Sequence, residues 1–461
     1  MSTTRNQICI VGQGYVGLTL SAVMAEVGFD VLGLEQDEEK LEGLQNNEPH
    51  FEEPELANTI ATQRRLGNLR FARDTDVPEA ADRSTYILAV GSPLRADNRP
   101  NVDIVQSAVK SIASVIQEDN LVILRSTIPP GTAEQMVGVL EEETGLEAGE
   151  DFLLAHAPER TLQGSALSEL RNLPQIIGGY NTPSVDAAEE VFREVTDTIV
   201  RVGPLRAAEM VKLMDNTYRD VNIAIGNAFG EIARAYGLDG QSLITAANKG
   251  YDRNNIKQPG AGVGGGCLPK DPYLLLDEFD EDGLTARELA SEMIVNARSL
   301  NEEMPNVTVS MIKDALTEYD DIHALVLGVA FKGRPATNDI RHTPAGPIIE
   351  ALDEFGKIDA FDPHVENEKI ESLGARPVER TDDESLTSLV ERAGYDVLVV
   401  ANNNPLFKEL DLFRVREAND RDVILVDGWG MYSPRTVERV GLQYVGVGRS
   451  PQYGQPDTLC E

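Results

Sequence analysis

Cysteine is scarce in this chain of 461 residues, which has only Cys9, Cys267 and Cys460. So few thiols exclude a disulfide framework, and no Cys-x-x-Cys or histidine-rich spacing offers a metal site. Cys9 is expected in a strand core and Cys460 as a free thiol of the tail. Because there is no apolar run of about 18 residues and no signal-peptide pattern, we expect a soluble, cytoplasmic protein without a membrane partner.

Lysine is the second shortage, with 11 of the 41 basic residues against 77 acidic ones. The formal net charge of −36 excludes nucleic acid and anionic membranes as partners, because both would be repelled. The acidic residues are dispersed, so they do not form an acidic tail. A surface poor in lysine and rich in carboxylates resembles that of proteins from a high-salt cytoplasm, where salt screens the self-repulsion.

The order of apolar runs predicts three parts. Residues 1–203 alternate apolar runs, such as 86–90 and 121–124, with helical segments, as in a doubly wound parallel sheet. Residues 204–305 are helical, with one long helix or two in line over 207–235. A second βα series occupies residues 306–461. We therefore predict an α/β protein with two Rossmann-like parallel-sheet domains joined by a central helical domain.

A glycine turn near the N-terminus predicts dinucleotide binding. The apolar run 7–11 leads into Gly12, Gly14 and Gly17 and then into a helical pattern, so a strand, a tight turn and a helix follow one another. Such a turn brings a pyrophosphate to the helix N-terminus. A second strand ends at Glu35, whose carboxylate suits a ribose 2′-hydroxyl and repels a 2′-phosphate. This context indicates a turn that binds a dinucleotide and is not purely structural. It favours NAD over NADP as the cofactor.

Cys267 lies at the end of a glycine-rich stretch, residues 262–271, and is followed by Pro269, Lys270 and Asp271. A thiolate can trap an aldehyde covalently, and a nearby cation or helix N-terminus would favour the thiolate. The alternative is a buried cysteine packed as a small hydrophobe. Glycines on one side and charges on the other are atypical of a core segment, so we interpret Cys267 as a nucleophile.

Together, these motifs resemble the UDP-glucose/GDP-mannose dehydrogenase family of nucleotide-sugar 6-dehydrogenases over nearly the whole chain. The resemblance is carried by residues 12–17, 91–93, 126–132, 158–160, 208–217, 262–271, 331–332 and 339–341.

The resemblance implies oxidation of a sugar 6-hydroxyl to a carboxylate, with two NAD and one cysteine. Cys267 is similar to the nucleophile that forms a thiohemiacetal and then a thioester. Lys212 and Asn216, four residues apart on one helix face, match the pair that stabilises developing oxyanions, although a solvated helix face is the structural alternative. Asp271 resembles the carboxylate that orients water, and Glu159 the base for thioester hydrolysis.

The resemblance also implies binding residues and a homodimer or higher homo-oligomer. Arg253 is implied as a substrate contact that reaches across the dimer interface. The implied cofactor contacts are Gly12, Gly14, Tyr15, Val16, Gly17, Glu35, Lys40, Ser92, Thr127, Lys270 and Arg341. The implied substrate contacts are Glu159, Arg160, Lys212, Asn216, Arg253, Ile256, Gly260, Gly264 and Lys332.

Several segments indicate which UDP-sugar is the substrate. Residues 156–162, 216–222 and 255–260 resemble the branch that oxidises UDP-N-acetylmannosamine. Gly266 departs from that branch, which usually has histidine there, and residues 268–271 resemble the UDP-glucose type. UDP-glucose and UDP-N-acetylglucosamine 6-dehydrogenases therefore stay open, as does a sensor that binds NAD and UDP-sugar without turnover. A single-step β-hydroxyacid dehydrogenase would need neither the thiol loop nor a third domain.

Overall fold

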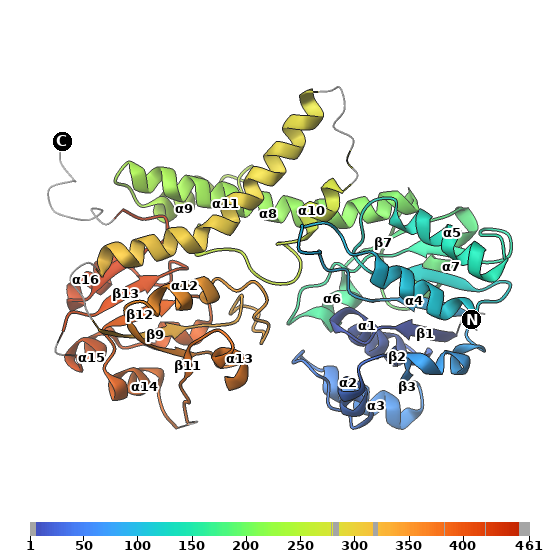
Figure 1. Ribbon diagram of the computed structural model, residues 1–461, viewed down its shortest axis with the longest axis horizontal. Helices are drawn as coiled ribbons and strands as arrows, with labels where there is room; N and C mark the ends of the chain where they lie inside the picture. The colour runs from blue at the N-terminus through green and yellow to red at the C-terminus, as the bar shows by residue number, and fades with distance from the viewer. Residues whose placement is uncertain are drawn as a thin grey trace. The chain divides into compact units, whose positions relative to one another are not determined.

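The computed structural model describes residues 6–277, 279, 285–316, 321–381, 383–419 and 421–450 (Figure 1). Cys460 lies outside these residues. The chain divides into two compact units, Met1–Asn216 with Tyr273–Asp280, and Thr217–Pro272 with Glu281–Glu461. The boundary falls inside one helix, α8 (Leu205–Ala235), so the helical pattern over 207–235 forms a single helix. The division into three domains stays a prediction.

The first unit is built on an eight-stranded sheet in the order β3-β2-β1-β4-β5-β6-β7-β8. All neighbouring pairs are parallel except β6 and β7. The strands are β1 (Gln7–Val11), β2 (Asp30–Glu35), β3 (Leu69–Arg73), β4 (Thr85–Leu88), β5 (Leu121–Leu124), β6 (Leu153–His156), β7 (Gln175–Gly179) and β8 (Ile199–Pro204).

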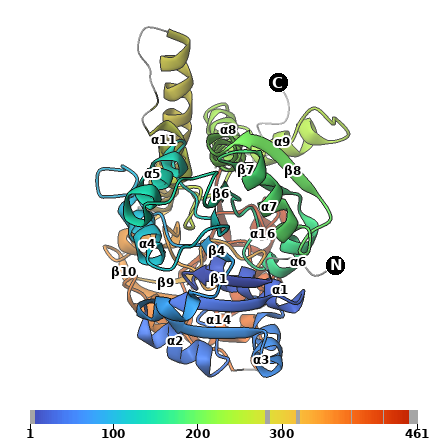
Figure 2. The same ribbon diagram turned by 90° about the vertical axis from the view of Figure 1, so that its right-hand side faces the viewer.

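Helices cover both faces of this sheet. Ile8 and Ile10 pack into one core, while Cys9 and Val11 pack into the other, as the two-residue period of a strand requires. Cys9 is fully buried, which confirms its expected place in a strand core. Figure 2 shows one layer with α4 (Asp103–Ala113) and α5 (Thr132–Thr144), and a second with α1 (Tyr15–Glu26), α6 (Ala166–Asn172) and α7 (Thr182–Phe192). Shorter segments are α2 (Glu38–Gln45), α3 (Leu56–Leu66) and the 3-10 helix η1 (Asp74–Ala80).

The second unit contains a six-stranded, fully parallel sheet in the order β11-β10-β9-β12-β13-β14. The strands are β9 (Ile322–Leu327), β10 (Gly356–Phe361), β11 (Arg376–Pro377), β12 (Val397–Val400), β13 (Ile424–Asp427) and β14 (Gln443–Gly446). The two parallel-sheet regions predicted from the sequence are thus confirmed.

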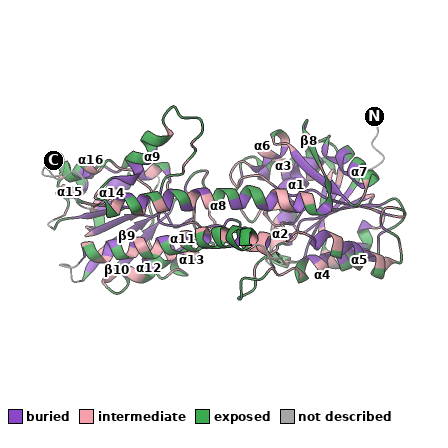
Figure 3. Ribbon diagram, turned by 90° about the horizontal axis from the view of Figure 1, so that it is seen from above, coloured by how far each residue is buried: buried purple, intermediate pink, exposed green. Residues whose placement is uncertain are grey.

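Helices enclose this second sheet as well, so its central strands β9, β12 and β13 are largely buried (Figure 3), whereas the edge strands β11 and β14 are partly exposed. One core joins the sheet to α11 (Thr285–Ala315) and α12 (Ala345–Leu352), and the opposite core joins it to α14 (Leu386–Ala393) and α15 (Leu412–Glu417). The remaining elements are α9 (Gly240–Asn248), α10 (Asp271–Leu276), α13 (Asn367–Glu371), η2 (Pro405–Glu409) and α16 (Pro434–Val440). Within the described ranges, no helix is both long and apolar enough to cross a membrane.

Candidate active site

The glycine turn lies where the strand order of the first sheet reverses, between β1 and β4. Ligands of open parallel sheets bind at this position, beyond the carboxyl ends of the strands. Gly12 has φ +86°, and a Cβ on Gly17 would lie 1.8 Å from the Gly12 carbonyl oxygen. A Cβ on Gly14 would meet nothing within 4 Å. Gly12 and Gly17 are therefore needed by the turn itself, while Gly14 leaves open space at the start of α1.

Glu35 ends β2 beside this turn and is buried. One of its carboxylate oxygens accepts a hydrogen bond from the Gln13 N–H at 3.0 Å, and the other accepts from Gln36 at 2.9 Å and Asp37 at 3.0 Å. Glu35 therefore supports the turn in addition to placing a negative charge beside it. Lys40, in the first turn of α2, forms an ion pair with Asp37 at 3.5 Å.

The loops after β4 and β5 are joined to each other by Ser92 and Thr127. The Ser92 hydroxyl donates to the Thr127 carbonyl oxygen. Glu209 of α8 accepts from the N–H groups of Gly131 at 2.6 Å and Ala133 at 2.7 Å, and thereby ties α8 to the start of α5. Burial raises the pKa of Glu209 to about 7, although these two N–H donors favour its ionised form.

Glu159, Lys212 and Arg125 meet in the interior of the first unit. Arg125 donates to Glu159 at 2.5 Å, and the N–H groups of Arg160 and Thr161 donate to the other carboxylate oxygen at 2.6 and 2.7 Å. Burial disfavours the charged form of Glu159, but Arg125, the Thr161 N–H and the nearby Lys212 outweigh it and lower the pKa of Glu159. Glu159 is therefore a fixed carboxylate beside Lys212.

Lys212 and Asn216 are both buried and lie one turn apart on α8, rather than on a solvated helix face. Arg125 was not predicted from the sequence, although it directly follows the apolar run of β5. The sequence signal that could have found Arg125 is an arginine directly after an apolar run, because an arginine buried at that place needs a partner.

Arg160 and Tyr15 make contacts that the motifs did not predict. The Arg160 guanidinium donates to Asp215 at 3.2 Å and to the Pro174 carbonyl oxygen at 2.5 Å, so it fastens the turn around Glu159 to α8. The Tyr15 hydroxyl donates to Glu53 at 2.5 Å, and Glu53 also accepts from the Gly164 N–H at 2.7 Å. The glycine turn is thereby linked to the segment that follows Arg160. Val16 packs against the core of this unit.

In the second unit, Cys267 is exposed at the end of the glycine-rich loop. Its carbonyl oxygen accepts from the N–H groups of Lys270 at 3.0 Å and Asp271 at 2.9 Å, and α10 begins at Asp271. The Lys270 ammonium group donates to the fully buried Asp271 carboxylate at 2.6 Å. Lys270 is therefore paired with Asp271.

Arg341 is the cation that packs against this loop. A Cβ on Gly266 would lie 2.6 Å from an Arg341 Nη, and the Gly265 N–H donates to the Arg341 carbonyl oxygen at 2.8 Å. Hydrogen bonds with Asp339, and then the negative charge of Asp339, hold the pKa of Arg341 above its usual value, although partial desolvation opposes them. The space beside Gly266 is therefore occupied by the end of the flexible Arg341 side chain.

Other predicted substrate contacts lie along the same unit. A Cβ on Gly264 would lie 2.5 Å from the His342 carbonyl oxygen, and the Lys332 ammonium lies 5.4 Å from the centre of the Phe331 ring. Ile256 exchanges two backbone hydrogen bonds with the Asn248 side chain, at 2.8 and 3.1 Å. The Arg253 guanidinium lies over the Tyr251 ring, 5.4 Å from its centre. Gly260 is buried, and its N–H donates to Asn227 at 3.0 Å.

The second sheet also has a reversal of strand order, between β9 and β12. Asp362, at the end of β10, accepts from the N–H groups of Val329 and Ala330 at 2.8 and 3.0 Å. Asn403, after β12, accepts from the Gly333 N–H at 2.9 Å. These bonds hold the loop that carries Lys332 at the carboxyl edge of the sheet, where a ligand of a parallel sheet binds.

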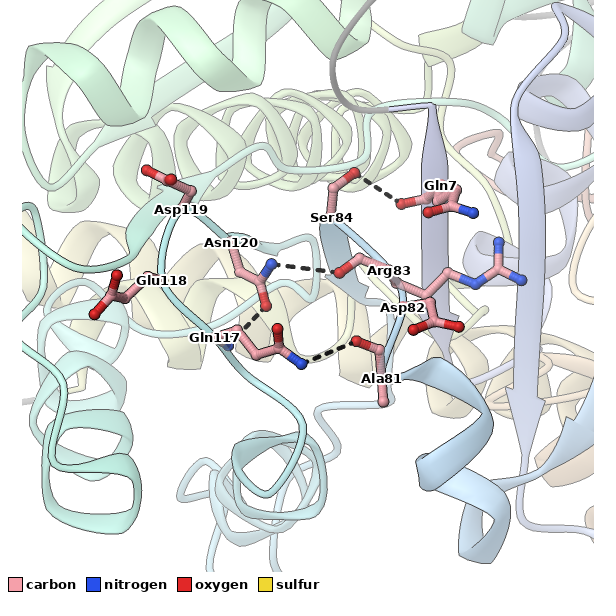
Figure 4. Close-up of a pocket in the computed structure, with 9 residues that line it drawn as sticks. All are labelled: Gln7, Ala81, Asp82, Arg83, Ser84, Gln117, Glu118, Asp119 and Asn120. Atoms are coloured by element: carbon pink, nitrogen blue, oxygen red, sulfur yellow. Dashed lines mark hydrogen bonds between the residues drawn. The ribbon is translucent and has the colours of Figure 1, made fainter.

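A polar cavity of about 860 Å³ lies at the opposite, amino-terminal edge of the first sheet (Figure 4). Its lining includes Gln117 and Asn120. The Asn120 side chain accepts from the Gln117 backbone N–H at 2.8 Å and donates to the Arg83 carbonyl oxygen at 3.3 Å, and the Gln117 amide donates to the Ala81 carbonyl oxygen at 3.3 Å. These groups stabilise the connections before β4 and β5, and none of the predicted site residues lines the cavity.

The two sheets, each with a reversal of strand order where a ligand of a parallel sheet binds, define a nucleotide-binding α/β protein of the dehydrogenase class. Residues 6–196 match the NAD binding domain of the UDP-glucose/GDP-mannose dehydrogenase family, residues 206–302 its central domain and residues 325–434 its UDP binding domain. The chain belongs to the UDP-glucose/GDP-mannose dehydrogenase family and is an NAD-dependent oxidoreductase.

Several relatives are similar over their whole length. A UDP-N-acetyl-D-mannosamine dehydrogenase from Pyrococcus horikoshii is 34% identical over 96% of this chain and 99% of the relative. A solved UDP-D-ManNAc dehydrogenase from Pyrococcus horikoshii has a TM-score of 0.84, with 34% identity, and covers 96% of this chain and 100% of the other. A solved UDP-glucose dehydrogenase from Pyrobaculum islandicum has a TM-score of 0.82, with 26% identity, and covers 97% and 99%.

Proposed function

We propose that this protein is a UDP-N-acetylmannosamine 6-dehydrogenase that forms the corresponding uronic acid through Cys267. The observation that carries the proposal is an exposed Cys267 at the end of a glycine loop, beside Arg341, in a chain that matches all three domains of the family. The most similar relatives reported above bear the name of this activity.

The residues at the glycine turn fit NAD, because Gly14 leaves open space at the start of α1 and the Glu35 carboxylate lies beside it. NAD, when bound, accepts one hydride in each of two oxidation steps. Tyr15, Val16, Lys40, Ser92, Thr127, Lys270 and Arg341 are the further cofactor contacts that we propose.

The protein's own residues would carry out the remaining chemistry. Lys212 and Asn216 stabilise negative charge on the C6 oxygen as its proton leaves. The Cys267 thiolate adds to the C6 carbonyl and forms a thiohemiacetal, which becomes a thioester after the second oxidation. Water then adds to the thioester and the thiolate leaves, so that the sugar ends as a carboxylate. Asp271 orients the water, and Glu159 draws its proton.

Glu159 would act as a weak base that is already ionised. Its lowered pKa means that it stays ionised at neutral pH but holds a proton weakly. Arg160, Arg253, Lys332 and the segment from Ile256 to Gly264 complete the proposed contacts with the sugar nucleotide.

The test is NADH release from a panel of nucleotide sugars with the purified protein. UDP-N-acetylmannosamine should yield two NADH per sugar and turn over faster than UDP-glucose, because a pocket with a partner for the acetamido group discriminates strongly. A UDP-glucose 6-dehydrogenase is the second candidate, which residues 268–271 favour. Saturable turnover of UDP-glucose, with none of either UDP-N-acetylhexosamine, would select it. NAD and UDP-sugar binding without any turnover would indicate the sensor.

We propose a homodimer formed through α8. Within the second unit, this helix exposes a stripe of large apolar side chains at helical spacing, and Figure 3 shows exposed turns alternating with buried ones. The stripe comprises Tyr218, Ile225, Phe229 and Ile232 of α8 and Tyr236 directly after it, which are 43–79% exposed. Ile232→Glu should yield a monomer in light scattering, whereas an unchanged mass would exclude this surface.

We also propose that the protein works in a high-salt cytoplasm, on the basis of its charge of −36. Its melting temperature should rise as KCl increases from about 0.1 M to molar levels, where the Debye length falls to about 3 Å. A flat or falling melting temperature would reject this habitat.

A further inference from the structure

A hydrogen-bonded network of four buried polar side chains lies between α8, α11 and the loop that carries Cys267. It comprises Asp220 and Asn227 of α8 and Arg298 and Asn301 of α11, each at most 1% exposed. Buried polar groups are costly unless they are well paired, and here Asp220 Oδ2 and Arg298 Nη2 have no hydrogen-bond partner among the described residues. Apolar side chains could join two helices at a lower cost, so the retained polarity calls for a purpose.

The hydrogen bonds within the network are specific. Arg298 donates to Asp220, and the Asn301 amide donates to the same carboxylate oxygen at 2.9 Å. The Asn227 amide donates to Asn301 Oδ1 at 2.8 Å, so each member fixes the next. Both amide side chains use their oxygen and their nitrogen, which leaves a single orientation for each.

Two further hydrogen bonds connect this network to both ends of the loop from Gly260 to Leu268. Asn227 Oδ1 accepts the Gly260 N–H at 3.0 Å, and Arg298 Nη1 donates to the Leu268 carbonyl oxygen at 3.4 Å. Leu268 directly follows Cys267, and Gly260 opens the glycine-rich segment. A further ion pair, between Arg298 and the half-exposed Glu302 at 3.3 Å, faces solvent.

We propose that Asp220, Asn227, Arg298 and Asn301 are positioning residues that hold the loop from Gly260 to Leu268, and with it the Cys267 thiol, in the geometry required to trap the aldehyde. This inference rests on the proposed function of Cys267. It follows because the hydrogen bonds bracket the loop, whose glycines would otherwise leave its backbone free to move. The four side chains do not touch the reacting atoms and act only through the loop.

Two variants test the inference. Asn227→Ala removes both the acceptor of the Gly260 N–H and the donor to Asn301. The double variant Asp220→Leu with Arg298→Met replaces the ion pair by apolar side chains of similar size, an exchange that often preserves folding. Glu303→Ala is the matched control, because Glu303 is an exposed residue of α11 that does not belong to the network. NAD binding and the melting temperature identify the variants that stay folded.

In a folded variant, the first oxidation should continue while trapping fails. We expect NADH per sugar to fall from two toward one, free 6-aldehyde to be captured by a carbonyl reagent, and alkylation of Cys267 by iodoacetamide, followed by peptide mass spectrometry, to change at least threefold. Glu303→Ala should match the wild type. Two NADH per sugar at the wild-type rate, with unchanged alkylation, in either folded variant would overturn the inference.

The same assay distinguishes failure of the proposed function. If Cys267→Ala still forms the acid with two NADH per sugar, the proposed function fails. If Cys267→Ala is inactive but the folded Asn227→Ala variant behaves as the wild type, only the positioning role fails.

Discussion

The two parallel sheets differ most in the connection that follows their first strand. In the first sheet, β1 ends at Val11 and α1 begins at Tyr15, so a short glycine turn delivers a helix N-terminus directly to the crevice. In the second sheet, β9 ends at Leu327 and α12 begins only at Ala345. Residues 328–344 between them carry Lys332 and Arg341. We propose that the first connection offers main-chain N–H groups to the cofactor phosphates and that the second offers the Lys332 ammonium group to the sugar nucleotide.

This difference affects how each region tolerates change. A turn made of main-chain groups fails when an atom is added, because no space exists for a Cβ at Gly17. A loop that acts through side chains fails when a side chain is removed. The predictions below use these opposite sensitivities.

The largest effect is expected at the thiol that packs against the second unit's long connection. Cys267→Ala should reduce acid formation by about a thousandfold or more, because no other nucleophile replaces the thiol. NAD should still bind, because the glycine turn is untouched. Cys9→Ala is the control, since Cys9 is buried in β1 and its loss should lower stability but preserve two NADH per sugar. One NADH per sugar in the wild type, with an aldehyde product, would sink the covalent mechanism.

The next effect separates two glycines of one turn. Gly17→Ala should weaken NAD binding by about 100-fold or more and lower the melting temperature, because the new Cβ would overlap the Gly12 carbonyl. Gly14→Ala should fold normally and weaken NAD binding by about 10-fold, since its Cβ enters open space toward the pyrophosphate. Calorimetry of NAD binding and thermal unfolding measure both. Equal melting temperatures for the two variants would contradict the steric argument.

A pair of single changes then tests whether the two crevices bind different ligands. Lys332→Ala should raise KM for the UDP-sugar about 10-fold and leave KM for NAD unchanged, because a charged hydrogen bond contributes about 1.5–3 kcal/mol. Glu35→Gln should narrow the preference for NAD over NADP and leave the sugar KM unchanged, since the 2′-phosphate is no longer repelled. Equal wild-type rates with NAD and NADP would refute the role of Glu35.

Much of this arrangement could be predicted from the sequence, because local patterns determine it. The apolar run before Gly12 and the helical pattern after the glycine turn predict the first strand and α1 without long-range information, although α1 already begins at Tyr15. The same holds for the long pattern of α8, which contains no proline.

The contacts that sequence reasoning missed all join segments that are distant along the chain. Arg125 reaches Glu159, Glu53 reaches Gly164, and Arg341 packs against Gly266. Single motifs contain no information on such pairings. Lys270 shows the converse, because it lies close to Cys267 in sequence, yet its ammonium group is paired with Asp271. The influence of Lys270 on the Cys267 thiol therefore stays a prediction.

The smallest expected effect concerns Glu209, which fastens α8 to the start of α5 by accepting two N–H groups. Burial raises the pKa of Glu209 to about 7 in the folded protein, from 4.5 for the ordinary group. A raised pKa means that protonated Glu209 contributes stability below about pH 4.5. This contribution, up to about 3 kcal/mol, is lost as the pH rises to about 7. Glu209→Gln cannot ionise and should lack this dependence.

The unfolding free energy of the wild type should therefore fall, relative to that of Glu209→Gln, between pH 4.5 and 7, and the two curves should run parallel above pH 8. Urea unfolding in molar KCl measures this difference while screening the surface carboxylates, which are the same in both proteins. Glu134→Gln, a change at an exposed carboxylate that faces Arg206 on α8, controls for general charge effects. Parallel curves over the whole range would mean that the two N–H donors offset the effect of burial and leave the pKa of Glu209 near its ordinary value. The Glu209 carboxylate would then hold the start of α5 through main-chain N–H groups, as the Glu35 carboxylate holds the glycine turn through the Gln13 N–H.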